Sequence, residues 1–171
     1  MCVIFGITDN KNASKLTYVG LFTLQHRGQE SAGIVTDDDG RLNRHSSMGL
    51  VSEIFTKEEL DKLKGGSAVG HVRYSTTGSS DAKNAQPLFF NSSLGALAVA
   101  HNGNLTNAAE LRAGLQKTGA IFQSTTDSEI VVHLMAKYRG KNLEDTIAKN
   151  LLRLEGAYSF LFMAPGKIIA A

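Results

Sequence analysis

Apolar residues recur along this chain with two different periods, which predicts that strands and helices follow one another. Short runs rich in β-branched and aromatic residues, such as 3–7, are typical of buried strands. Stretches with apolar residues three and four apart, such as 128–138, are typical of helices. The predicted strands are Val3–Ile7, Ser31–Thr36, Arg41–Ser46, Leu50–Phe55, Ser67–Arg73, Leu94–Ala100, Ala157–Met163 and Lys167–Ala171. The predicted helices are Ala13–His26, Lys57–Leu63, Asn107–Lys117, Ser128–Tyr138 and Leu143–Leu154.

The order of these elements indicates an α+β domain in which helices pack on sheets. Strands dominate the first part of the chain, a group of helices follows, and strands return at the end. The run Asp37–Gly40 is a hairpin turn signal between two of the strands. Because the sequence stops at Ile168–Ala171, inside a predicted strand, we expect one domain over 2–171 that is truncated at its C-terminus and belongs to a longer polypeptide.

Composition narrows the functional classes. The 171 residues fit one domain, and 42% hydrophobic with 20% charged residues is typical of a globular protein. A formal net charge of +2 without a basic run argues against a nucleic-acid partner. No apolar stretch approaches the ~20 residues that span a bilayer, and no signal peptide precedes the domain, so we expect no membrane partner and a cytoplasmic location.

The single cysteine is important for its position. One cysteine cannot form an internal disulfide, and the scattered histidines lack metal-ligand spacing, so we expect no metal site. Removal of Met1 would leave Cys2 with a thiol and a free α-amine. A free α-amine, with a reference pKa of about 8, is partly unprotonated at neutral pH and can accept the thiol proton. The alternative is that Cys2 simply opens a buried strand.

Polar, glycine-containing stretches interrupt the pattern where strands end or helices begin, which is where binding faces form. They are Gln25–Gly33, Gly70–Gly78, His101–Leu105 and Ser124–Glu129. Each also has an ordinary explanation. Asn102-Gly103 is a common hairpin turn, Asp127 or Thr126 can cap a helix, and Arg73 can be a surface residue at a strand end.

Taken together, these stretches supply what hydrolysis of an amide side chain requires. The side-chain amide of Asn102 and the backbone N–H of Gly103 can stabilise the oxyanion of a tetrahedral intermediate. An amino-acid substrate also carries an α-carboxylate, which the planar fork of Arg73 can bind, and an α-ammonium, which Asp127 can bind. With Cys2 as nucleophile, the set is complete for glutamine hydrolysis and needs no metal.

The chain resembles the class II glutamine amidotransferase domains of the amidophosphoribosyltransferase family. The stretches that carry the resemblance, in the family's order, are Met1–Ile7, Leu24–Ile34, His71–Gly78, Asn84–Pro87, His101–Leu105 and Thr126–Ile130. The resemblance implies the four-layer αββα sandwich of N-terminal nucleophile hydrolases. One departure is Val3, where the family usually has glycine after the nucleophile.

The resemblance also implies roles for individual residues. It implies Cys2 as the nucleophile, and an oxyanion hole and glutamine anchors at the residues named above. Thr76 and Arg27 are further candidates for substrate binding, although Arg27 could equally satisfy carbonyls at the end of the preceding helix.

In the full enzyme of this family, the resemblance implies that ammonia converts phosphoribosyl diphosphate to 5-phosphoribosylamine, the first step of de novo purine biosynthesis. Nothing in this sequence resembles the phosphoribosyltransferase domain, so we expect Mg²⁺ only with that domain, no cofactor in this chain, and a homo-oligomer only at full length. Two alternatives stay open: an amidotransferase domain serving a sugar phosphate or an amino acid as acceptor, and a non-catalytic glutamine-binding or docking domain.

Overall fold

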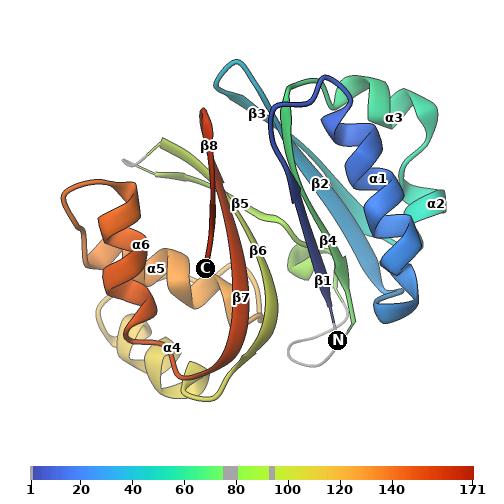
Figure 1. Cartoon of the computed structure of the whole chain (residues 1–171). Coiled ribbons are helices and arrows are strands. Elements are labelled where there is room, and N and C mark those ends of the chain that lie inside the picture. The colour runs from blue at the N-terminus through green and yellow to red at the C-terminus, as the bar shows by residue number, and fades with distance from the viewer. Residues whose placement is uncertain (1, 75–80, 93–94) are drawn as a thin grey trace.

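Two antiparallel sheets pack face to face, and helices cover the outer face of each, in a computed structural model that describes residues 2–74, 81–92 and 95–171 (Figure 1). The layers therefore run helix, sheet, sheet, helix. The predicted α+β class with a four-layer αββα sandwich is confirmed.

The first sheet contains four strands in the order β1-β4-β2-β3, with antiparallel pairing throughout. Its strands are β1 (Val3–Ile7), β2 (Ser31–Asp38), β3 (Arg41–Met48) and β4 (Ser67–Arg73). The helices on its outer side are α1 (Ala13–Leu24), α2 (Val51–Ile54) and α3 (Lys57–Lys62), and the short 3-10 turn η1 (Gln25–Arg27) continues α1.

The second sheet is also four-stranded and antiparallel, in the order β5-β6-β7-β8. Its strands are β5 (Leu88–Ser92), β6 (Gly95–Leu105), β7 (Gly156–Ala164) and β8 (Lys167–Ala170). Its helices are α4 (Ala108–Lys117), α5 (Ser128–Lys137) and α6 (Leu143–Leu151), and a second 3-10 turn, η2 (Ala82–Asn84), leads into β5.

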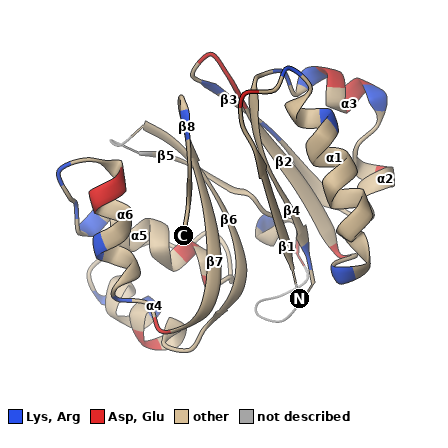
Figure 2. Cartoon of the chain, viewed as in Figure 1, with Lys and Arg blue, Asp and Glu red and all other residues tan. Residues whose placement is uncertain are grey.

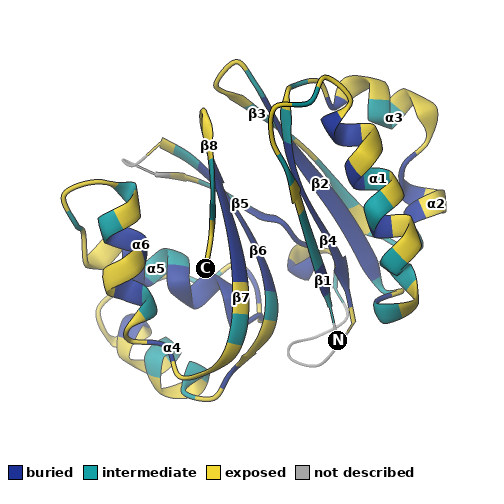
Figure 3. Cartoon of the chain, viewed as in Figure 1, coloured by how far each residue is buried: buried dark blue, intermediate teal, exposed yellow. Residues whose placement is uncertain are grey.

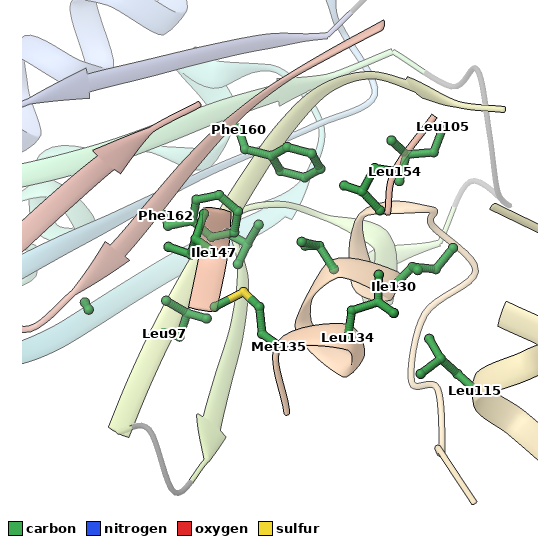
Figure 4. Packing of buried hydrophobic residues seen from close by; sticks show 13 residues of the cluster. Leu97, Leu105, Leu115, Ile130, Leu134, Met135, Ile147, Leu154, Phe160 and Phe162 are labelled. Carbon is green, nitrogen blue, oxygen red and sulfur yellow. The ribbon is translucent and has the colours of Figure 1, made fainter. Parts of the chain in front are cut away.

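Apolar side chains fill each of the three interfaces between layers, which is why the buried residues run along the strands and the inner helix faces (Figure 3). The layer between the sheets is built from Val35, Val69, Ala98, Ala100, Leu161 and Met163. The layer between the second sheet and α4–α6 includes the aromatic rings of Phe160 and Phe162 packed against Ile130, Leu134 and Met135 (Figure 4). The cluster between the sheets holds them together, and the larger cluster holds the helices on the second sheet.

One predicted strand is wrong. Residues 50–55, expected to be extended, contain the short helix α2. Gly49 adopts a positive φ of 120°, which ends β3, and the Glu53 carboxylate then accepts the N–H of Leu50. A side-chain contact from outside the segment also favours the turn, since the Val51 N–H donates to Gln25 Oε1.

The second sheet differs from the predicted pattern in two ways. The strand β5 was not predicted, and it pairs along its length with β6. The strand predicted over 94–100 begins outside the described residues and extends to Leu105, which places Asn102 and Gly103 inside β6, paired with Ser159 and Tyr158. The hairpin-turn alternative for these two residues is therefore wrong.

Charged side chains of both signs are scattered over the outer helices and the hairpin ends (Figure 2). None of the helices in the described part of the chain is long and apolar enough to cross a bilayer.

A buried histidine makes the fold sensitive to acid. His71 in β4 is fully buried, and its Nε2–H donates to the carbonyl oxygen of His101 at 3.0 Å. Burial, with the nearby charges of His101 and Arg73, lowers the pKa of His71 from 6.5 to about 3 despite that hydrogen bond. Below about pH 6.5 the unfolded chain therefore binds a proton that the folded chain excludes, so stability falls as pH falls.

We expect the free energy of unfolding to decrease, because of this group, by up to about 1.4 kcal/mol per pH unit between about pH 6 and pH 4. His71→Gln keeps a donor for the His101 carbonyl but cannot titrate, so its stability should depend less steeply on pH. Urea denaturation of both proteins across this range measures the two slopes. Equal slopes would show that His71 does not titrate as its burial requires.

Candidate active site

Cys2 lies at the end of the first sheet, beside the last residue of β4. Val3 pairs with Val72, so the next residues along the two strands are Cys2 and Arg73. The half-buried Cys2 Sγ lies 3.6 Å from the carbonyl oxygen of Tyr74 and 3.5 Å from its amide nitrogen. The backbone of Tyr74 thus holds the sulfur in place at the end of the sheet.

Arg73 is a buried cation at the end of β4. Its side chain is 3% exposed, and Nη1 donates to Glu30 Oε1 at 2.6 Å. The two residues meet because Ser31 pairs with Arg73 across the sheet, with Glu30 next along the chain. The surface alternative for Arg73 is therefore wrong. Sequence reasoning also missed Glu30, although it lies in one of the four polar stretches.

Gly28 lets the turn after α1 approach this site. A Cβ at Gly28 would lie 2.9 Å from the carbonyl carbon and oxygen of Arg73, so the backbones can meet only without a side chain there. Arg27 precedes it in η1 and is half-buried. Its part in substrate binding stays a prediction.

The second sheet contributes to the same site through Asn102 and Gly103 of β6. The register of β6 against β7 holds both, and Gly103 has a φ of +152°. A Cβ at Gly103 would lie 2.3 Å from the carbonyl oxygen of Ala157, so only glycine fits without moving β7. The unusual conformation is a reason to look for function here.

Asp127 is the N-cap residue of α5, but its side chain makes no capping hydrogen bond, so the interpretation of this carboxylate as a helix cap alone is wrong. Its carboxylate instead accepts the N–H of Leu105 at 3.0 Å and the hydroxyl of Ser128 at 3.4 Å, and it lies 3.5 Å from His101 Nδ1. Burial opposes the charged form, but the interactions with His101 and the hydrogen bond from Leu105 outweigh it and hold the pKa of Asp127 below its usual value. The side chain is therefore an anion at neutral pH.

A network of hydrogen bonds holds the residues that contact the Asp127 carboxylate. Gln86 accepts the N–H of His101 at 2.8 Å and donates to Ser128 Oγ at 2.9 Å, and that hydroxyl lies 2.9 Å from His101 Nδ1. The His101 ring stacks on Phe160. Sequence reasoning assigned none of these residues a role. The available signal was the position of Gln86 and His101 inside stretches that carry the family resemblance.

These groups meet at one pocket between the two sheets. Its lining residues are Cys2, Arg73, Tyr74, Gln86, His101, Gly103, Thr126, Asp127 and Ser128. Asn102 is half-buried and immediately precedes Gly103 on β6. The predictions for Met1 and Thr76 fall outside the described residues. The pocket thus combines a thiol, a cation, an anion and a backbone N–H, which suits an amino acid with a reactive side chain.

Among residues 2–74, 81–92 and 95–171, no three or more His, Cys, Asp and Glu side chains are grouped so that they could hold a metal ion.

Comparison with known proteins identifies the family. Residues 71–170 match the family model described as a glutamine amidotransferase domain. The chain is 46% identical to the amidophosphoribosyltransferase of Lacticaseibacillus casei over 99% of its own length and 88% of that protein. This chain belongs to the glutamine amidotransferases of the amidophosphoribosyltransferase family. The family assignment expected from the sequence is confirmed.

Other members of the family are longer. The chain is 47% identical to the amidophosphoribosyltransferase of Bacillus subtilis, over 99% of this chain and 36% of that protein. It superimposes on the solved B. subtilis glutamine phosphoribosylpyrophosphate amidotransferase, described as complexed with ADP and GMP, with a TM-score of 0.93 at 45% identity, covering all of this chain and 37% of the other. The chain thus spans about a third of the length of these relatives.

Proposed function

We propose that this chain hydrolyses the side-chain amide of L-glutamine to glutamate and ammonia. One observation carries the proposal: the Cys2 thiol, the Arg73 guanidinium, the Asp127 carboxylate and the Gly103 backbone line the same pocket. They come from both sheets and from the segment before α5. Membership in the amidotransferase family supports the same substrate.

The two charged side chains suit the two charges of a free amino acid. Arg73 is a buried cation that lines the pocket, and a planar guanidinium can bind the glutamine α-carboxylate through two parallel N–H donors. The buried Asp127 anion suits the α-ammonium. Binding at both ends would direct the side-chain amide toward Cys2.

The chemistry proceeds in two steps. Cys2 Sγ attacks the amide carbon, and the thiol proton passes to the α-amine that Cys2 carries once it is the first residue. The oxyanion is stabilised by the Gly103 N–H and the Asn102 side-chain amide. The carbon–nitrogen bond then breaks, and the proton held by the α-amine leaves with ammonia. Water attacks the resulting thioester and releases glutamate and the free thiol.

The fate of the ammonia belongs to the same proposal and rests on the relatives. Their printed name, amidophosphoribosyltransferase, supports transfer of ammonia to phosphoribosyl diphosphate. That reaction would need a phosphoribosyltransferase domain, Mg²⁺ bound with that domain, and a homo-oligomeric full-length enzyme. Assays of ammonia transfer to phosphoribosyl diphosphate, to sugar phosphates and to amino acids would distinguish the acceptors considered above.

A reducing compartment such as the cytoplasm suits the half-exposed Cys2 thiol, because the nucleophile must stay reduced. The names of the Arabidopsis thaliana relatives place those relatives in the chloroplast.

Covalent labelling tests the proposed function directly. A diazoketone analogue of glutamine should alkylate Cys2 rapidly, and glutamine in excess should slow that labelling, because both compete for Arg73 and Asp127. The same preparation should release glutamate and ammonia from glutamine. Peptide mass spectrometry locates the label and intact mass confirms that Cys2 is the first residue. Slow labelling that glutamine does not affect would contradict the proposal and favour a non-catalytic domain.

A further inference from the structure

The five residues that end at the proposed ammonium anchor, Asp127, have no regular secondary structure. Gln123–Asp127 connects the region after α4 to the first turn of α5 without helix or strand pairing. Three of its five residues are nevertheless buried, since Ser124, Thr126 and Asp127 are each less than a tenth exposed. Buried backbone N–H and C=O groups need partners, and here side chains from three other elements supply them.

Glu129, in the first turn of α5, holds the beginning of this segment. Its carboxylate accepts the N–H of Gln123 at 2.8 Å, the N–H of Ser124 at 2.7 Å and the Ser124 hydroxyl at 2.6 Å. His133, one turn further along α5, lies 3.3 Å from the same carboxylate. Burial opposes the charge, but these hydrogen bonds lower the pKa of Glu129 to about 2. Glu129 is thus a buried anion whose oxygens are directed at the segment.

Arg112 holds the carbonyl side of the same segment from α4. Its Nη1 donates to the carbonyl oxygen of Ser124 at 3.2 Å and its Nη2 to that of Thr126 at 2.7 Å. The guanidinium also stacks 4.0 Å from the centre of the Phe122 ring, which fixes its plane. A planar guanidinium carries its donors on separate nitrogens and can span two carbonyl groups in a fixed geometry, whereas the donors of a lysine share one nitrogen.

Asn84, at the end of η2, holds the middle of the segment. Its Nδ2 donates to Thr125 Oγ1 at 2.8 Å, and its Oδ1 accepts the N–H of Thr125 at 3.0 Å. Asn84 is fully buried and lies two positions before Gln86, which lines the pocket. The contact therefore ties η2 to the segment that ends at Asp127.

We propose that Glu129, Arg112 and Asn84 form a clamp on Gln123–Thr126 that positions Asp127 for the α-ammonium of glutamine. The three are positioning residues: they hold the backbone of the segment, and Asp127 is the residue that would touch substrate. The inference rests on the proposed function, because it assigns Asp127 the role of ammonium anchor. The clamp would determine how tightly glutamine binds, and it would have little effect on how fast the bound amide reacts.

Glu129→Gln is the first test. The neutral amide places an N–H₂ group against backbone N–H donors, so the segment should shift and Asp127 should lose its alignment. Loss of one well-aligned charged contact predicts a KM for glutamine raised about tenfold, with kcat changed less than about threefold. Alkylation of Cys2 by iodoacetamide, which has no α-ammonium, should keep its rate. The matched control is Glu144→Gln, since Glu144 is bonded to Lys167 on the surface and should leave KM unchanged.

A double variant separates positioning from general damage to the fold. If the clamp acts through Asp127, then Glu129→Gln added to Asp127→Asn should change KM by less than about twofold, because the anchor is already lost. If Glu129→Gln does not fold, Arg112→Lys takes its place in the experiment. The lysine keeps a positive charge near Phe122 but lacks the two guanidinium nitrogens that bind the carbonyl groups. Its control is Arg153→Lys, because Arg153 also stacks 4.0 Å from an aromatic ring, that of Tyr138.

The outcomes are distinguishable. A folded Glu129→Gln or Arg112→Lys protein with unchanged KM, additive penalties in the double variant, or a slower iodoacetamide reaction would overturn the clamp while leaving glutamine hydrolysis intact. A wild-type chain that neither hydrolyses glutamine nor reacts with its diazoketone analogue would overturn the proposed function, and the clamp with it. A KM effect confined to variants that retain Asp127 supports the clamp.

Discussion

Cys2→Ala should lower glutamine hydrolysis by at least about 10⁴-fold, because no other group in the pocket can form the thioester. The substitution should cost the fold less than about 1 kcal/mol, since Cys2 is half-buried and its sulfur contacts the backbone of Tyr74. Arg73 and Asp127 are untouched, so the variant should still bind glutamine. Glutamate release, thermal melting and calorimetric titration with glutamine measure these three quantities.

Cys2→Ser is the matched variant for this experiment. It keeps an atom that can bond to the backbone of Tyr74 but is a weaker nucleophile, so binding should be preserved and hydrolysis strongly reduced. Hydrolysis at the wild-type rate by the alanine variant would show that another residue carries the reaction. Loss of glutamine binding along with activity would instead assign Cys2 to the binding site.

Gly103→Ala should destabilise the chain by about 2–4 kcal/mol and lower kcat by about 10²-fold or more. The new Cβ would lie 2.3 Å from the carbonyl oxygen of Ala157 and 2.6 Å from the Cα of Tyr158, at a φ of +152° that alanine rarely adopts. Relief of the clash must move β6 away from β7. That movement displaces the backbone N–H assigned to the oxyanion hole.

Gly114→Ala is the matched control, because the same substitution should increase stability at that position. Gly114 lies in α4, nothing is within 4 Å of where its Cβ would be, and its φ is ordinary, so alanine should stabilise the helix by about 0.4–1 kcal/mol. Chemical denaturation compares the two variants with wild type. Equal stability of Gly103→Ala and wild type would show that β6 and β7 adapt without cost, and full activity would remove Gly103 from the oxyanion hole.

Much of the candidate site could be predicted from the sequence, because few structural roles require these residue types in these positions. Cys2, Arg73, Gly103 and Asp127 were named from residue type and context, and the structure brings all four to one pocket. Arg27 and Thr76 are different, since the first lies half-buried in η1 and the second outside the described residues. Their roles stay predictions.

The supporting residues could not be predicted for a physical reason. Glu30 meets Arg73 from 43 positions away, and Gln86 meets Ser128 from 42, so no local period reports either contact. The clamp joins α4, α5 and η2 in the same way. Even where a signal is local, as with Glu129 and Ser124, an acidic residue in the first turn of a helix has an ordinary electrostatic explanation.

The sequence by itself determined the α+β class, most helices, the family and the reactive groups, because side-chain periodicity and reactivity are properties of local residue order. Only the tertiary structure decided that 50–55 forms a helix, that residues 88–92 form β5, and that Asn102 and Gly103 lie within a strand. Two of these depend on a partner distant in sequence, Gln25 for α2 and β7 for Gly103, and β5 depends on pairing with the strand β6 that follows it. Local propensity is weak compared with such contacts, so the fold overrode it there.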